Sequence, residues 1–445
     1  MRARQDWAAA QLREWYLFPD LLATGVDPAR YATVDDYVDA LTAPARAQRR
    51  DRNFTYLTSI REEDAYYDNG TSEGFGFQLG FVNDVLLVRE AYEGAPALAA
   101  GMDRGTVIEA IGTSEATARP VRDLLAEGGG AAVAAALGTG AAGEARYFRF
   151  YVGNRQPLRS ATITSASYTL QPVSPRYGVQ IFDAPTSTIS DVVNGQPVFE
   201  HYRRTGYLNL RTFVSTADQP MRDAFARFRA AGITDLIVDL RYNGGGLVSS
   251  AELLADLIGG ARSADDVQSR MTFRPDKAGE NVTRRFQPRP ESVATVKVAF
   301  LTGPGTASAS ELVINAMTPY LRSESVMVGQ NSYGKPVGQI AIDRSECDDR
   351  LRIVAFATQN AAGRGDYYGG LRDSVEATCA ATDFAATFDT ADALISIARS
   401  RLARPLCTPM TVASASGDAA PRSLPPEPLR ARRPNAAQQH IEGLF

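Results

Sequence analysis

The sequence predicts an α/β fold in which a mainly parallel sheet is covered by helices. Apolar, strand-like runs at residues 233–240 and 295–301 alternate with amphipathic helical stretches at 218–231 and 249–258. Such alternation is typical of parallel strands joined by helical crossovers. Since 445 residues exceed the usual size of one domain, we expect this sheet to belong to one of two or three domains.

The rest of the chain divides into segments of different character. Residues 1–68 place apolar side chains at helical spacing, so we expect a helical N-terminal module that serves for packing or capping. Residues 69–155 alternate glycine with apolar residues, which predicts a small β domain. The α/β core is expected over 156–404. A Pro/Arg-rich tail over 405–445 is expected to be draped on the surface or disordered.

Composition and charge argue against several classes of function. The net charge of −4 gives no electrostatic reason to expect nucleic acid or anionic lipid as a partner. No run of about 18 apolar residues is present, so we expect no transmembrane segment. Cys347, Cys379 and Cys407 lack metal-ligand spacing, and we expect neither a metal nor another cofactor. One disulfide with one free thiol, or three free buried thiols, remain open as alternatives.

A small-residue loop delivers Ser308 and Ser310 to the start of a helix expected over 311–318. Ser308-Ala-Ser-Glu311 fits a capping box, so a purely structural role for Ser308 is one interpretation. A serine at a helix N-terminus also has backbone N–H groups beside it, where negative charge is favoured. Those are the elements of an oxyanion hole, and the two interpretations are compatible.

A nucleophilic serine in this chain needs a base other than histidine, because only His201 and His440 are present. Lys335 follows downstream, next to a mostly apolar stretch. Burial there would lower its pKa and make it a base, whereas a solvated lysine stays protonated. Gln339 lies four residues on, on the same face of a strand, where its amide can orient Lys335.

A glycine-rich turn over 239–246, Asp-Leu-Arg-Tyr-Asn-Gly-Gly-Gly, follows the apolar run 233–240. Three glycines leave the backbone unobstructed, so its N–H groups can approach a substrate carbonyl. An ordinary βα turn is the alternative explanation. A phosphate-binding loop is excluded because no Gly-Lys-Ser/Thr follows, and the dinucleotide-binding fingerprint is incomplete.

The order of these motifs, D-L-R-x-N-x-G-G, then S-A-S-E, then G-K-x-x-x-Q, resembles that of the tail-specific, or C-terminal-processing, serine proteases. The similarity extends over about residues 70–400. It implies a serine endopeptidase with an α/β core of the crotonase-like β–β–α type. In this family the first serine of S-A-S-E is the nucleophile, which implies Ser308 rather than Ser310. The same resemblance implies Lys335 as the general base and Gln339 as its assistant.

The resemblance also implies an oxyanion hole and a substrate-binding domain. The backbone N–H groups of Ala309 and Gly245 would form the oxyanion hole. The segment 69–155 resembles an inserted PDZ-like domain, which binds the C-terminus of a protein or peptide substrate as an added strand. An ordinary small β module is the alternative. The residues of its carboxylate-binding loop would be Gly74, Phe75, Gly76 and Phe77.

One position departs from the family pattern, and two other functions are alternatives. Pro336 stands where glycine usually follows the lysine, and proline fixes the local backbone. An inactive protein that binds a peptide or a hydrophobic ligand on the same fold is the alternative function. An α/β-hydrolase esterase is disfavoured, because no G-x-S-x-G elbow surrounds Ser308 or Ser310.

The start of the sequence gives two options for location. Asp6, Arg13 and Glu14 interrupt any apolar leader, so the protein is either cytoplasmic or has lost a leader. Bacterial members of the family usually work outside the cytoplasm, so the resemblance implies a periplasmic or cell-envelope location. In such a compartment Cys347 and Cys379 could form a disulfide bond.

Overall fold

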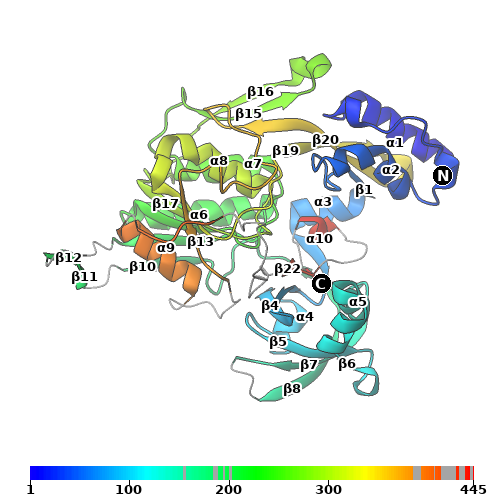
Figure 1. Cartoon of the computed structure of the whole chain (residues 1–445), viewed down its shortest axis with the longest axis horizontal. Coiled ribbons are helices and arrows are strands. Elements are labelled where there is room, and N and C mark those ends of the chain that lie inside the picture. The colour runs from blue at the N-terminus through cyan, green and yellow to red at the C-terminus, as the bar shows by residue number, and fades with distance from the viewer. Residues whose placement is uncertain are drawn as a thin grey trace, which may run out of the picture.

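Figure 1 shows a larger body, with the N-terminal helices and the central sheet, and a smaller lobe of strands beside one long helix. Residues 71–170 make up this smaller lobe, which we call the second lobe. The structure is a computed structural model, and it describes residues 1–153, 157–183, 189–193, 196–199, 203–383, 392–404, 406–411, 427–429, 436–440 and 444–445.

A six-stranded sheet forms the predicted α/β core. Its strand order is β10-β13-β14-β17-β18-β21, and every pair from β13 to β21 is parallel, whereas β10 pairs with β13 antiparallel. β13, β14 and β18 are buried along their whole lengths, as expected of a sheet covered on both faces. The strands are β10 (Val179–Phe182), β13 (Thr205–Asn209), β14 (Asp235–Asp239), β17 (Lys297–Thr302), β18 (Ser325–Gly329) and β21 (Ala377–Ala380).

Helices cover the two faces of this sheet, and the pleat of β14 shows how. Leu236 and Val238 pack into the cluster formed with α6 (Asp218–Ala230), α7 (Val248–Ile258) and α8 (Ala309–Leu321). Ile237 points to the other face and packs with α9 (Ala393–Ala403). Successive side chains of a strand alternate between faces, so one apolar strand serves both layers.

An antiparallel sheet lies beside this core and carries the N-terminal helices. Its order is β1-β20-β15-β16, with β19 also paired to β20. α1 (Arg2–Trp15) and α2 (Val34–Ala47) bury an apolar face on β19 and β20, in a cluster that includes Leu12, Val337 and Ile353. The N-terminal helices are therefore part of the body of the molecule. The strands are β1 (Tyr56–Ser59), β15 (Val267–Phe273), β16 (Val282–Arg285), β19 (Val337–Arg344) and β20 (Asp349–Gln359).

The second lobe is built on a further sheet, of order β22-β3-β4-β5-β7-β8, with β6 paired to β5. Its core contains Phe75, Phe77 and Phe148, whose rings contact one another, and α5 (Val121–Leu137) packs into the same cluster. The strands are β3 (Phe77–Val82), β4 (Val85–Ala91), β5 (Val107–Gly112), β6 (Arg119–Pro120), β7 (Ala145–Tyr151), β8 (Leu158–Thr164) and β22 (Glu427–Pro428).

Short elements complete the structure. β2 and β9 form an antiparallel pair, as do β11 and β12. These elements are α3 (Ile60–Asn69), β2 (Thr71–Gly74), α4 (Pro96–Ala99), β9 (Ala166–Thr169), β11 (Ile189–Val193), β12 (Gln196–Phe199) and α10 (Ala436–His440).

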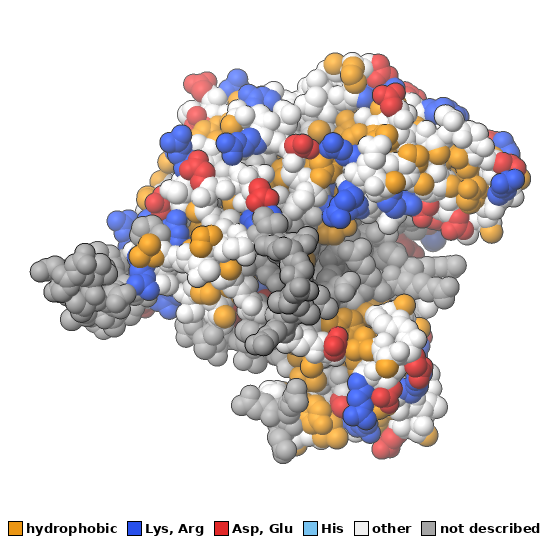
Figure 2. Space-filling model, viewed as in Figure 1, with side chains coloured by type: hydrophobic (Ala, Val, Ile, Leu, Met, Phe, Trp, Pro, Cys, Tyr) orange, Lys and Arg blue, Asp and Glu red, His pale blue; other side chains and the backbone are white. Residues whose placement is uncertain are grey.

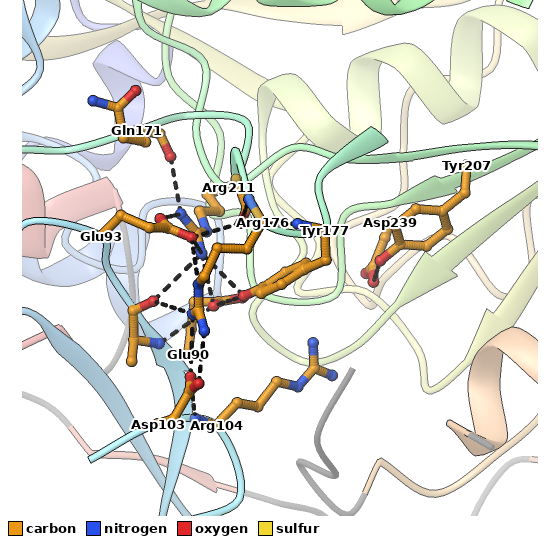
Figure 3. Close-up of polar contacts among 12 residues, drawn as sticks. Glu90, Glu93, Asp103, Arg104, Gln171, Arg176, Tyr177, Tyr207, Arg211 and Asp239 are labelled. Atoms are coloured by element: carbon orange, nitrogen blue, oxygen red, sulfur yellow. Dashed lines mark hydrogen bonds and ion pairs between the residues drawn. The ribbon is translucent and has the colours of Figure 1, made fainter. Parts of the chain in front are cut away.

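Buried ion pairs join the second lobe to the central sheet (Figure 3). Arg211, only 3% exposed, lies two residues after β13 and donates to Glu93 at 2.6 Å and to Glu90 at 2.9 Å. Arg176 adds a 2.6 Å bond to Asp103. Burial acts to raise the pKa of Glu93, but the hydrogen bond and charge of Arg211 prevail and lower it to about 2. Ion pairs as well as apolar packing therefore hold the second lobe against the core.

The disulfide differs from the expected one. Cys379, on β21, is bonded to Cys407, so the expected pairing with Cys347 is wrong and Cys347 is an exposed free thiol. After α9 the chain runs beside β21, where Ala380 N donates to Thr408 O at 2.7 Å. Cys347 instead lies between β19 and β20 in the antiparallel sheet. Of the alternatives left open by composition, one disulfide with one free thiol is correct.

Residues 427–429, 436–439 and 444–445 of the C-terminal tail are packed against the rest of the chain. β22 pairs with β3, and α10 lies against α3 in an apolar cluster. These pieces differ from the expected surface-draped or disordered tail, because their apolar side chains are covered. Residues 412–426, 430–435 and 441–443 lie outside the described part of the chain, as does His201. The buried side chains of the tail are those of Leu429, Ala436, Ala437, Gln438, Leu444 and Phe445.

Candidate active site

Ser308 and Ser310 lie at the N-terminus of α8, where a loop from the carboxyl end of β17 enters the helix. The helix begins at Ala309, two residues earlier than expected, and Ser308 is its N-cap. Ser308 has φ 55° and ψ −113°, a conformation that non-glycine residues rarely adopt. Ser310 is fully buried, and its Oγ donates to Asn243 O at 2.9 Å. Ser308 is partly exposed, and is thus the serine of the pair that a substrate can reach.

Lys335 lies just before β19, and its ammonium is held by neighbouring groups. Lys335 Nζ donates to Gln339 Oε1 at 2.7 Å and lies 4.8 Å from the centre of the Phe54 ring. Gln339 Nε2 in turn donates to Phe54 O. Burial among these groups disfavours the charged ammonium and lowers the pKa of Lys335 to about 8.

Glu311 ties the serine segment to the lysine segment. Its Oε2 accepts hydrogen bonds from Ser308 N at 3.0 Å and from Lys335 N at 2.7 Å. Its Oε1 accepts from Gly334 N at 2.7 Å. Burial raises the pKa of this fully buried carboxyl, while the hydrogen bonds favour its charged form. The capping box predicted from the sequence is therefore also the link between the two candidate residues.

Pro336 fits this arrangement without loss of a hydrogen bond. The residue has no N–H to satisfy, and its carbonyl oxygen accepts from Thr358 N at 2.9 Å on β20. A residue that precedes proline is restricted to extended backbone, which suits Lys335 at the entry to a strand. The departure from the family pattern is thus accommodated by the strand pairing.

The N-terminal segment also reaches the site, which sequence analysis did not foresee. Besides the contacts of Phe54, Arg52 donates from Nη2 to Tyr333 O at 3.0 Å and to Gly334 O. Its guanidinium lies 4.1 Å from the centre of the Tyr333 ring. The turn that presents Lys335 is therefore braced by residues about 280 positions earlier in the chain.

The glycine turn lies directly against Ser308. Gly245 has φ 113°, and a Cβ atom there would lie 2.9 Å from Ser308 Cβ and 3.1 Å from Ala309 N. Only glycine permits so close an approach. Gly245 N donates to Asn243 Oδ1 at 2.9 Å, and Asn243 Nδ2 donates to Leu210 O at 3.0 Å. In this arrangement the Gly245 N–H is therefore already engaged, whereas Ala309 N lies in the first helical turn, which offers it no intrahelical acceptor.

A buried arginine fixes the position of this turn. Arg241, 1% exposed, lies 2.9 Å from Asp239 and 2.9 Å from Asp392. Asp392 caps α9, where it accepts from Leu394 N at 2.9 Å. The turn is therefore connected through Asp392 to α9, which lies on the face of the sheet opposite to α8.

The loop predicted to bind peptides, 74–77, is occupied by another part of the chain. Gly76 N and Phe77 N donate to Phe445 O at 2.8 and 3.3 Å. Gly74 is buried against Phe445, while the side chains of Phe75 and Phe77 point into the core of the lobe.

Other kinds of site find little support in the described ranges. No helix in them is long and apolar enough to cross a membrane. Within the same residues, no group of three or more His, Cys, Asp or Glu side chains is arranged to hold a metal ion. Figure 2 shows basic and acidic side chains interspersed on the visible face.

The sequence of the core is similar to that of a known family. Residues 204–365, which contain Ser308, Lys335 and Gln339, match the model of the family described as peptidase family S41. Over these residues the chain is similar to peptidase family S41. The resemblance to C-terminal-processing proteases that the motif order indicated is thereby confirmed.

Curated relatives resemble this chain over part of their length. The chloroplastic C-terminal processing peptidase of Tetradesmus obliquus is 25% identical over 352 residues, which cover 77% of this chain and 66% of the relative. A probable CtpA-like serine protease of Staphylococcus epidermidis is 26% identical over 148 residues, 33% of this chain and 28% of the relative. The chain thus spans less than two thirds of the length of these relatives.

The fold of this chain is also found among solved structures. A putative S41 protease from Bacteroides fragilis aligns with a TM-score of 0.64 at 20% identity. The alignment covers 88% of this chain and 96% of that chain. This likeness confirms the mixed α/β architecture.

Proposed function

We propose that the protein is a serine endopeptidase in which Ser308 is the nucleophile, Lys335 the general base and Gln339 the residue that holds the base. One observation carries the proposal: Gln339 binds a lysine whose pKa is lowered to about 8, and Glu311 ties that lysine to Ser308. Such a lysine is about one tenth neutral at pH 7, against less than about one thousandth for an ordinary lysine.

The proposed reaction proceeds through an acyl-enzyme. Neutral Lys335 takes the proton from Ser308 Oγ, which attacks the scissile carbonyl. Protonated Lys335 then gives the proton to the leaving amine. Water, deprotonated by Lys335, attacks the ester and releases the second product together with Ser308. Gln339 keeps the ammonium in place through both proton transfers.

The oxyanion formed by this attack is proposed to be bound by Ala309 N–H and Gly245 N–H. Ala309 lies at the positive end of α8, where negative charge is favoured. The Gly245 N–H contributes when it turns from Asn243 Oδ1 toward the substrate. The contact between Gly245 and Ser308 supports this role, because it brings the turn next to the reacting oxygen.

The second lobe is proposed to act as a PDZ-like module that binds the C-terminus of a protein or peptide substrate. Its glycine-rich loop offers the N–H groups of Gly76 and Phe77 to a backbone oxygen. A peptide added as a strand to β3 would gain main-chain hydrogen bonds there.

The test of this function is incubation of an unfolded reporter protein with wild type, Ser308→Ala and Ser310→Ala, followed by mass spectrometry of the fragments. We expect the same cleavage sites for wild type and for Ser310→Ala, and none for Ser308→Ala. If the protein were an inactive binding protein, no variant would give fragments. Labelling by a serine-reactive fluorophosphonate that disappears in Ser308→Ala gives a second readout.

An extracytoplasmic location is proposed on chemical grounds. The disulfide between Cys379 and Cys407 forms and persists in oxidising compartments. Cell fractionation, with alkylation of free thiols before and after reduction, tests this: a protein that is found reduced in the cytosol contradicts the proposal.

A further inference from the structure

The second lobe holds a piece of its own chain along the edge of β3. Phe445 N donates to Phe77 O at 3.0 Å, and Phe445 O accepts from Gly76 N at 2.8 Å. Leu444 pairs with Gln78 in an antiparallel bridge. These two residues thus extend the sheet in the place where the sequence predicted a bound peptide.

A second piece of the tail continues along the same edge. β22 pairs antiparallel with the far half of β3, and Leu429 N donates to Leu79 O at 3.3 Å. The Leu429 side chain is buried against α5, where a Cβ atom at Gly130 would lie 3.6 Å from Leu429 Cδ1. Residues 427–429 and 444–445 therefore fill both the edge of β3 and the groove beside α5.

The loop before β3 fits closely around Phe445. The Phe445 side chain is 1% exposed and packs into the apolar cluster of the lobe with Phe75 and Phe77. Gly74 has φ 145°, and a Cβ atom there would lie 2.7 Å from Phe445 C. The loop thus combines two backbone donors with an apolar pocket for a large side chain.

We propose that residues 427–429 and 444–445 are an intramolecular ligand of this groove, and that they compete with substrate chains that carry a large apolar residue after a leucine. Because the tail is part of the same molecule, its effective concentration at the groove reaches the millimolar range. A substrate must therefore displace it before binding. The expected effect on proteolysis rests on the proposed peptidase function, whereas the binding of the tail to the groove does not.

The occupied strand also contacts the candidate active site. Gln78, which pairs with Leu444, donates from Nε2 to Tyr242 O at 3.3 Å. Tyr242 precedes Asn243, the residue that holds the Gly245 N–H. A substrate peptide that replaced the tail would therefore lie beside β3, the strand whose Gln78 contacts the glycine turn.

The binding test uses a fluorescein-labelled peptide with the sequence of residues 436–445 and the full chain carrying Ser308→Ala, so that hydrolysis does not interfere. Anisotropy compares this chain with the same chain carrying Phe445→Asp, and with one shortened to residue 435. Leu158→Asp, an exposed apolar position on β8 of the same lobe, is the matched control. We expect the peptide to bind at least about tenfold more tightly to the Phe445→Asp and shortened chains, with no change in the control.

Two results would overturn the proposal. In the first, both tail variants keep the circular dichroism and melting temperature of the control but bind the peptide no more tightly. In the second, both tail variants lose the folded second lobe, which would make the tail a fixed structural strand rather than a ligand.

The activity arm separates this proposal from the proposed function. With Ser308 intact, Phe445→Asp is expected to lower KM for a reporter that ends in Leu-Phe by at least about fivefold, and to leave KM unchanged for one that ends in Asp-Asp. Tighter peptide binding without any turnover would refute the peptidase function alone. Equal changes in KM for both reporters would contradict competition at the groove.

Discussion

Lys335 Nζ donates a 2.7 Å hydrogen bond to Gln339 Oε1, and the other end of that amide is held by the carbonyl oxygen of Phe54. Because Gln339 Nε2 is the donor to Phe54, Oε1 is the atom that faces the lysine. The lysine thus meets a neutral acceptor rather than a carboxylate, so its pKa stays low enough for base catalysis.

Replacement of Lys335, the proposed base, by another cation is expected to abolish activity. Lys335→Arg keeps the positive charge, but guanidinium does not lose its proton in the accessible pH range. We expect kcat/KM on the unfolded reporter to fall at least about 1,000-fold. Lys277→Arg, at a lysine paired with Glu14 far from the site, serves as the control. Retention of about a tenth of the activity in Lys335→Arg would exclude the lysine as the base.

The pH dependence of activity is expected to follow the ionisation of Lys335. In the proposed mechanism the neutral amine is the active form, so kcat/KM should rise about tenfold per pH unit and level off above about pH 8. Its folded pKa lies below the unfolded value of about 10.4, so the unfolded chain binds more protons between these values and stability rises with pH across that window. Lys335→Met should remove this rise, as measured by urea unfolding at pH 7.5 to 10.5. A rate that stays flat from pH 6 to 9 would contradict the assignment.

A carboxylate in place of the Gln339 amide is expected to move the pH profile. In Gln339→Glu a negative charge would face the ammonium, which raises the pKa of Lys335. The rising limb of kcat/KM should therefore shift to higher pH, with a loss of at least about tenfold at pH 7 that narrows at pH 9. A loss of the same size at every pH would indicate damaged packing instead. Gln219→Glu, exposed on α6, controls for the added charge.

Glu311→Gln is expected to cost both stability and activity. The carboxylate accepts from the backbone N–H groups of Ser308, Gly334 and Lys335, whereas an amide has one oxygen and brings N–H groups of its own. Each buried donor left without a partner costs about 1–3 kcal/mol. We therefore expect a lower melting temperature and a lower kcat.

The control for this variant is Glu280→Gln, at an exposed position. If Glu311→Gln had the same melting temperature as the control and kept its kcat, the carboxylate would not be the link between the serine segment and the lysine segment.

Loss of Arg211 is expected to loosen the second lobe. Arg211→Met leaves Glu90 buried without its cation, and breaking a buried pair in this way costs about 3–5 kcal/mol. Hydrogen exchange should become faster in β3 and β4 than in β14, because the pair joins the lobe to the core. Arg227→Met, on the exposed side of α6, is the control. Uniform exchange across both parts would argue against a local role.

Local motifs were sufficient to predict the core of the candidate site. Ser308 and Glu311 lie within the first turn of α8, whereas Lys335 lies two residues before β19, the strand that contains Gln339. Each pair is therefore close in the sequence. The alternation of strands and helices likewise predicted the central sheet, because parallel strands require crossovers. These features depend on neighbours in the sequence.

The remaining features depend on contacts between distant segments, which leave no local pattern. Phe54 and Arg52 belong to a stretch that looked like a covering module, and nothing nearby marks them as neighbours of Lys335. The pairing expected from the sequence differs from the disulfide in the structure. The path of the chain after α9, and not the spacing of the cysteines, brings Cys407 to Cys379. Pairing of the tail with β3 is also invisible locally, since its few apolar residues follow a proline-rich run.

The contribution of Phe54 to the environment of the base has a consequence for how relatives are compared. A chain trimmed before residue 55 would retain every motif by which a peptidase of this type is recognised. It would nevertheless lack the ring that shields the ammonium and the carbonyl that orients Gln339. Such a protein would still contain the three motifs, but we expect its lysine to have an ordinary pKa and to be protonated. Whether such a relative can be catalytically active therefore has to be judged from its N-terminal segment together with the motifs.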